Sequence, residues 1–80
     1  MNYMDYDLEK VDEFALALLY FSSFKEGFAT RAWKGMDWDI LNRLTEKGFI
    51  GDAKNKNKSI VFTDEGVEKG KVLIEKFFKK

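Results

Sequence analysis

The chain has 80 residues, of which 45% are hydrophobic and 16% aromatic, a size and composition that suit one small domain spanning residues 1–80. Fourteen basic residues balance fourteen acidic ones, and the absence of Cys and His excludes disulfides and removes the usual general base, thiol nucleophile and soft-metal ligands. We therefore expect a cytoplasmic protein that is not an enzyme, with no catalytic residues, no metal and no cofactor.

The charges are divided between the two halves of the chain. Residues 1–40 carry eight acids and four bases, a net charge of −4, whereas residues 41–80 carry ten bases and six acids, a net charge of +4. This polarity could orient the protein on a polyanion or let two copies meet head to tail. A solvated surface without a binding role is the simpler interpretation.

The first helix is predicted over Leu8–Ser22, with Asp7 as its N-cap. Apolar residues follow two neighbouring lines of this helix, and its C-terminal half is apolar nearly all round. Because so small a domain can hardly bury such a helix completely, we predict a homodimer, although a central core helix is a close alternative. The predicted contact residues are Phe14, Leu18, Phe21 and Trp33.

The segment from Ser23 to Met36 has an ambiguous pattern. Gly27 indicates a turn, and Phe28–Trp33 fits either a short helical turn or a short strand. Trp33 and Trp38 lie on either side of a basic residue, and such aromatic side chains can stack on bases or anchor a partner. Trp38 is predicted to be part of the core, and the role of Trp33 stays open.

Asp37 is the predicted N-cap of a second long helix, which runs to about Lys47. Gly48 directly follows this helix, where a left-handed glycine commonly ends one. Phe49 is then expected to fold back on the last helical turn.

A hairpin and a final helix complete the predicted domain. Phe49–Gly51 is expected to pair antiparallel with Ser59–Phe62 around a basic tip, Asp52–Lys58. Thr63 is the predicted N-cap of a helix over Asp64–Phe78, which we expect to pack on the first helix.

Gly70 falls inside the predicted last helix, where glycine costs about 1 kcal/mol relative to alanine. It is either merely tolerated or required by a close approach to another helix, for which the first helix is the best candidate.

The stretch LNRLTEKGFI, followed after the basic tip by KSIVFTDEGVEKGKVLIEKFF, resembles the second half of winged-helix regulators of the MarR and PadR type. The resemblance implies an α+β winged-helix-type domain, with helices around a short antiparallel hairpin called the wing. The helix that normally precedes the recognition helix is expected to be shortened or replaced by a strand. The whole chain also resembles a small bacterial family of stand-alone proteins, a resemblance that implies no activity.

Two groups of polar residues are candidates for binding nucleic acid. The wing tip carries lysines at alternate positions, and side chains at alternate positions of an extended arm share a face. In the winged-helix interpretation, the helix from Asp37 to Lys47 would read bases, although its first turn is acidic and so unfavourable beside phosphates. The candidate residues are Lys54, Asn55, Lys56 and Lys58 in the wing and Asn42 and Arg43 in the helix.

Two functions remain as hypotheses. One is weak, salt-dependent DNA binding of the transcription-regulator type through the wing lysines. The alternative is a protein-interaction or dimerisation module that uses the same scaffold to bind an unidentified protein or a second copy. Neither requires a membrane or a small-molecule substrate.

Overall fold

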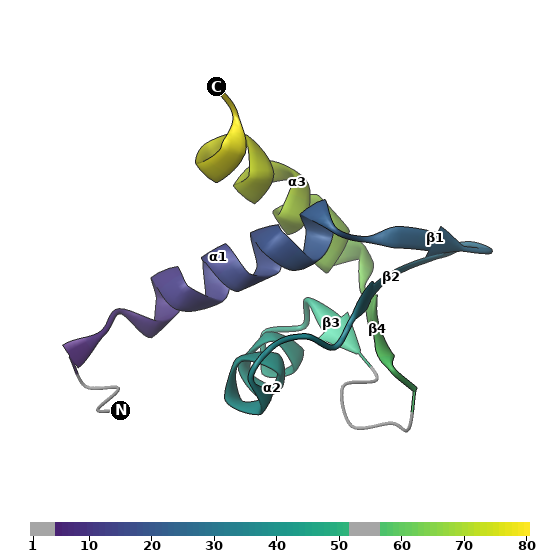
Figure 1. Cartoon of the computed structure of the whole chain (residues 1–80), viewed down its shortest axis with the longest axis horizontal. Coiled ribbons are helices and arrows are strands. Elements are labelled where there is room, and N and C mark those ends of the chain that lie inside the picture. Colours follow the sequence, from purple (N-terminus) through teal and green to yellow (C-terminus); the bar gives the residue numbers. More distant parts are fainter. Residues whose placement is uncertain (1–4, 52–56) are drawn as a thin grey trace.

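The computed structural model describes residues 5–51 and 57–80 (Figure 1). It is an α+β domain, as predicted, in which four strands form one antiparallel sheet in the order β1-β2-β4-β3. The arrangement is compatible with a winged-helix-type domain. Among the described residues, no helix is long and apolar enough to cross a membrane. The elements in chain order are α1 (Leu8–Phe21), β1 (Phe24–Glu26), β2 (Ala29–Trp33), α2 (Trp38–Glu46), β3 (Ile50–Gly51), β4 (Ser59–Phe62) and α3 (Asp64–Phe78).

The helices begin at the predicted capping residues. The carboxylate of Asp7 accepts hydrogen bonds from the backbone N–H groups of Glu9 and Lys10, at 3.0 and 3.3 Å. Asp37 and Thr63 cap α2 and α3 in the same way. These side chains satisfy amide groups that have no partner inside a helix, which explains why each helix starts there.

Strands replace the second helix of the winged-helix pattern, as expected. β1 and β2 form a hairpin in which Phe24 lies opposite Arg31, and Gly27 in its turn has a φ of +64°. The alternation along β2 then directs Thr30 and Ala32 to the buried side of the sheet.

The wing also forms as predicted. Ile50 pairs with Phe62 and Gly51 with Val61, while Phe49 lies just before β3. Gly48 has a φ of +80°, the left-handed conformation expected after α2. Residues 52–56 of the wing tip lie outside the described part of the chain.

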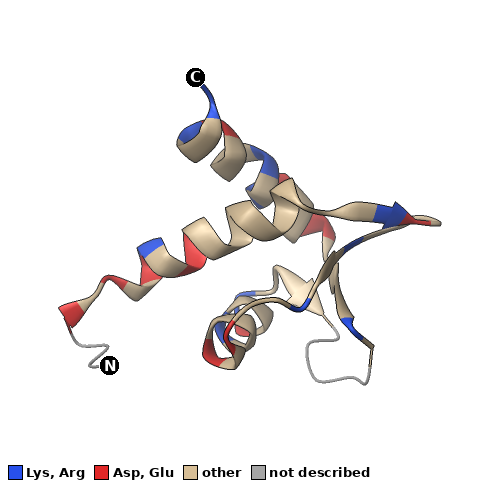
Figure 2. Ribbon diagram, in the orientation of Figure 1, with Lys and Arg blue, Asp and Glu red and all other residues tan. Residues whose placement is uncertain are grey.

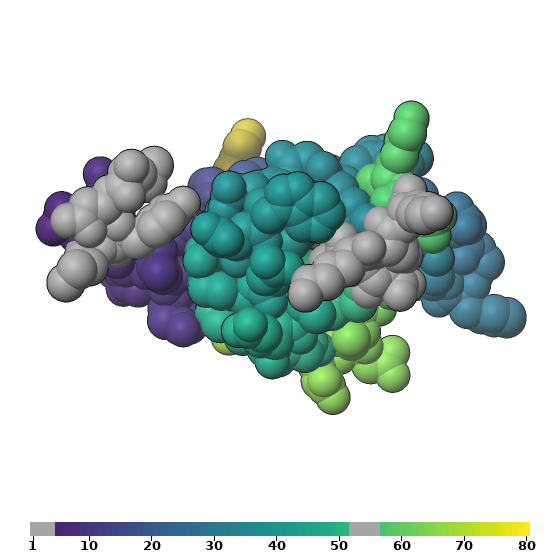
Figure 3. Space-filling model, turned by 90° about the horizontal axis from the view of Figure 1, so that it is seen from below, coloured from purple at the N-terminus to yellow at the C-terminus, as the bar shows by residue number. Residues whose placement is uncertain are grey.

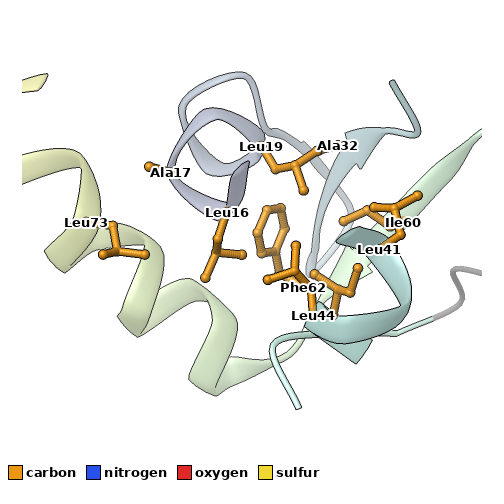
Figure 4. Packing of buried hydrophobic residues seen from close by; sticks show 10 residues of the cluster. Leu16, Ala17, Leu19, Ala32, Leu41, Leu44, Ile60, Phe62 and Leu73 are labelled. Atoms are coloured by element: carbon orange, nitrogen blue, oxygen red, sulfur yellow. The ribbon is translucent and has the colours of Figure 1, made fainter. Parts of the chain in front are cut away.

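The core lies between one face of the sheet and the three helices. Figure 4 shows the ring of Phe62 among leucine side chains of α1 and α2, with Leu73 on α3 farther from the ring than Leu16. Leu16, Leu41 and Leu44 are each 1% exposed, so α1 and α2 bury these three side chains completely. The buried cluster consists of Leu16, Ala17, Leu19, Ala32, Leu41, Leu44, Ile50, Ile60, Phe62 and Leu73.

Two glycines allow α3 to approach its neighbours closely. A Cβ atom at Gly70 would lie 2.6 Å from Cγ of Tyr20 on α1, so the predicted close contact between the first and last helices is confirmed. A Cβ atom at Gly66 would overlap the backbone carbonyl of Phe49, which accepts a hydrogen bond from the N–H of Thr63. Both glycines are therefore required by packing.

Candidate functional site

Arg43, one of the two candidate base readers, is engaged inside the protein. Its Nε donates to Oδ2 of Asp12 at 2.8 Å, and its Nη2 donates to Oδ1 of the same carboxylate, also at 2.8 Å. This bidentate pair connects α2 to α1 and fixes the planar guanidinium group. Reading a base would require Arg43 to leave this carboxylate.

The carboxylate of Asp12 also accepts a hydrogen bond from Nζ of Lys47 at 3.0 Å, although Asp12 is only 2% exposed. Burial alone would raise the pKa of Asp12, but hydrogen bonds and charges from Arg43 and Lys47 hold it below its usual value. Burial likewise disfavours the charged form of Lys47, yet Asp12 and Glu9 raise its pKa. Asp12 and Lys47 are therefore both charged at neutral pH, and the ion pairs of Asp12 with Arg43 and Lys47 join α1 to α2.

The other nucleic-acid candidates are not gathered into one described site. Asn42 is half-buried on α2, and Lys58 is exposed beside the start of β4. Lys54, Asn55 and Lys56 lie outside the described residues. Figure 3 shows α2 in the centre of one face, and this helix begins with the acids Asp37 and Asp39.

The two tryptophans are both at the surface, 62% and 57% exposed for Trp33 and Trp38. The prediction that Trp38 belongs to the core is therefore wrong. It is the first residue of α2, where the ring lies outside the buried stripe of Leu41 and Leu44, and Nζ of Lys34 lies 5.9 Å from its centroid. Trp33 points away from the buried side of β2 and packs on Phe24, with ring centroids 4.9 Å apart.

The most unusual surface is on α1. Between Val11 and Phe21, every exposed residue of this helix is apolar. Exposed faces of helices in soluble proteins normally carry polar residues. We call these residues the α1 stripe: Val11, Phe14, Leu18 and Phe21, which are 37%, 46%, 39% and 71% exposed.

The C-terminal end of α3 extends the α1 stripe. The ring of Phe14 packs edge-to-face on the rings of Phe77 and Phe78, with centroids 5.4 and 5.7 Å apart. The ring of Phe21 lies 5.7 Å from that of Phe78. Aromatic side chains of two helices thus form one continuous, partly exposed apolar surface.

Sequence reasoning selected three residues of this surface and missed Val11, Phe77 and Phe78. Val11 lies three residues before Phe14, a spacing that already indicated a common helix face. The two phenylalanines of α3 could be assigned to this surface only once the crossing of α1 and α3 was known. Trp33, the fourth predicted contact residue, lies on β2 and packs on Phe24 of the same hairpin.

Charged residues are unevenly distributed around the α1 stripe. Figure 2 shows acidic residues along the N-terminal part of α1, no charged residue along its C-terminal half and basic residues at the end of α3. Glu13 joins the two helices through Lys69 and Lys76, at 3.8 and 3.5 Å. The surface is therefore uncharged along the C-terminal half of α1, acidic towards the first turn of α1, and basic where the end of α3 lies beside Phe14 and Glu13.

Comparison with known proteins assigns the chain to a family. Residues 7–80 match the model of a domain of unknown function, DUF6429. The chain belongs to this family. The DUF6429 chain is also 43% identical over 75 residues to the uncharacterized protein y4hR of Sinorhizobium fredii, a match that covers 94% of this chain and 97% of that protein. No solved structure matches it.

Proposed function

We propose that this protein is a non-enzymatic interaction module, and that the α1 stripe is the surface on which another polypeptide docks. The observation that carries the proposal is the wholly apolar exposed side of α1 between Val11 and Phe21. Large apolar patches with a polar border are typical of protein-interaction sites. An apolar side of a partner helix suits this surface, because side chains spaced three and four residues apart form a straight seam.

DNA binding has less support from the described residues. Arg43 is held by Asp12, and α2 presents two acids at the end that would approach phosphates. Lys58 remains available as an exposed cation, and the remaining wing candidates lie outside the described chain.

The proposal predicts that removing the apolar character of the α1 stripe abolishes assembly while preserving the fold. We expect the double variant Leu18→Gln/Phe21→Gln to migrate as a monomer in extracts of cells that make the protein, whereas the wild type migrates as a larger complex. Both side chains are exposed, so the melting temperature should change little.

Val72→Gln is the matched control, because Val72 is also apolar and exposed but lies on the side of α3 next to Phe49. It should leave the complex intact. Identical migration of the wild type and the double variant would refute the proposal.

A direct titration separates the proposal from DNA binding. We expect wild-type protein to show no increase in fluorescence anisotropy of a mixed-sequence duplex at low salt.

If wild-type protein does bind the duplex, the triple variant Lys54→Gln/Lys56→Gln/Lys58→Gln should no longer bind it tightly. The slope of log affinity against log salt would then become shallower by roughly 0.9 for each phosphate that the variant no longer neutralises. That outcome would favour the DNA hypothesis over docking on the α1 stripe.

A further inference from the structure

The spacing of the α1 stripe is the same when read in either direction along the helix. Successive members are separated by three, four and three residues, the spacing of a coiled-coil seam. A second α1 helix can therefore be placed against the first so that each stripe residue faces another. This self-matching spacing is the first reason to consider a second copy as the docking polypeptide.

The sizes of the side chains favour an antiparallel arrangement. In that orientation Val11 faces Phe21 of the second copy, and Phe14 faces Leu18. Each layer then combines an aliphatic side chain with an aromatic one, which allows the seam to be filled evenly. A parallel arrangement would instead place Phe21 against Phe21 and Val11 against Val11, leaving one layer crowded and another underfilled.

The charges favour the same orientation. The first turn of α1 carries Glu9 after the acidic cap Asp7, and Glu13 follows one turn later. The C-terminal half of α1 carries no charged residue. Parallel copies would bring the two acidic first turns together, whereas antiparallel copies place each acidic first turn beside the uncharged C-terminal half of the other α1.

We infer that the protein forms a two-fold symmetric homodimer in which the two α1 stripes pack antiparallel, each flanked by Phe77 and Phe78. The inference rests on the proposed function and names the docking polypeptide as a second copy of this chain. A two-fold axis makes the contact isologous, so the apolar surface is covered on both copies and the assembly stops at two.

Disulfide cross-linking tests this arrangement cleanly, because the chain has no cysteine of its own. The test uses Val11→Cys and Phe21→Cys proteins, each alone and mixed in equal amounts, under mild oxidation. In an antiparallel dimer the two different positions face each other, while identical positions are about 15 Å apart along the helix axis. A disulfide needs Cα atoms within about 7 Å, so we expect the mixed disulfide in high yield and little of either homodisulfide.

Glu68→Cys serves as the collision control, since Glu68 is exposed on α3 away from the stripe. Circular dichroism confirms that each variant is folded, and light scattering of the purified wild type should give the mass of two chains at micromolar concentration. A mixed disulfide no more abundant than with the Glu68→Cys control, or predominant homodisulfides, would overturn the antiparallel dimer.

The homodimer and the interaction module are refuted by different results. Purified wild type that stays monomeric at high micromolar concentration refutes the homodimer. If the stripe variant still loses a larger complex in cell extracts, the interaction module survives with a different polypeptide on α1. If the extract complex does not depend on the stripe either, both proposals fall.

Discussion

Replacing Asp12 with Ala should lower the free energy of unfolding by about 3 kcal/mol, because it leaves two cations of α2 without their shared buried carboxylate. The value is at the lower end for a broken buried ion pair, since Arg43 and Lys47 keep about a quarter of their side chains exposed. Urea denaturation at neutral pH measures the change. Glu9→Ala is the matched control, because Glu9 binds the same Lys47 at 3.1 Å from an exposed position and should cost less than about 1 kcal/mol.

The ion pair of Asp12 with Arg43 and Lys47 should stabilise the fold less at acidic pH than at neutral pH. The folded state holds the pKa of Asp12 below its unfolded value, so the ionised carboxylate stabilises the fold. This contribution is complete above about pH 5, roughly one unit above the usual pKa of an unfolded Asp, and is lost as the pH falls through the lowered folded pKa. Asp12→Asn cannot titrate and should lose less stability than wild type between about pH 5 and pH 2. Parallel stability curves for the two proteins would show that Asp12 does not carry this effect.

Replacing Gly66 with Ala should destabilise the protein by about 3 kcal/mol, despite the better helix propensity of alanine. The new methyl group would overlap the backbone carbonyl of Phe49, which cannot move without disturbing its hydrogen bond from Thr63. Gly70→Ala meets the ring of Tyr20 instead and should cost less, because a side chain can shift.

Gly35 provides the control for these glycine variants. Nothing lies within 4 Å of a Cβ atom built at Gly35, so Gly35→Ala should be neutral or slightly stabilising. Thermal or urea denaturation of the three variants gives the comparison. A Gly66→Ala protein as stable as Gly35→Ala would contradict the close contact with Phe49.

Most of the fold could be predicted from short sequence patterns, because helix caps and helix ends depend on residues that are close together in the sequence. The caps at Asp7, Asp37 and Thr63 and the left-handed glycine at Gly48 each act within one helical turn, and all four were identified correctly. The segment between α1 and α2 stayed ambiguous because a run of six residues fits one helical turn as well as one strand. Ala29–Trp33 forms a strand because β2 pairs with β4, and that contact joins residues about thirty positions apart in sequence.

The candidate site was harder to predict for the same reason. Nothing near Arg43 in sequence shows that its partner is Asp12, thirty-one residues earlier, so the side chain resembled an exposed base reader. The wrong prediction for Trp38 has a similar origin, because an aromatic residue beside a helix cap fits the core or the surface equally well until the buried face of α2 is known. Phe14, Leu18 and Phe21 of the α1 stripe were recognised from periodicity, but their exposure depended on how much of the helix α3 covers.

The packing of α1 on α3 also bears on how the chain folds during synthesis. Tyr20 of α1 packs on Gly70 of α3, so α1 leaves the ribosome before the helix that covers it, which is made about fifty residues later. Until α3 emerges, α1 presents its apolar side chains on more than one side of the helix to solvent or to chaperones. The order of synthesis therefore delays completion of the core until α3 is released.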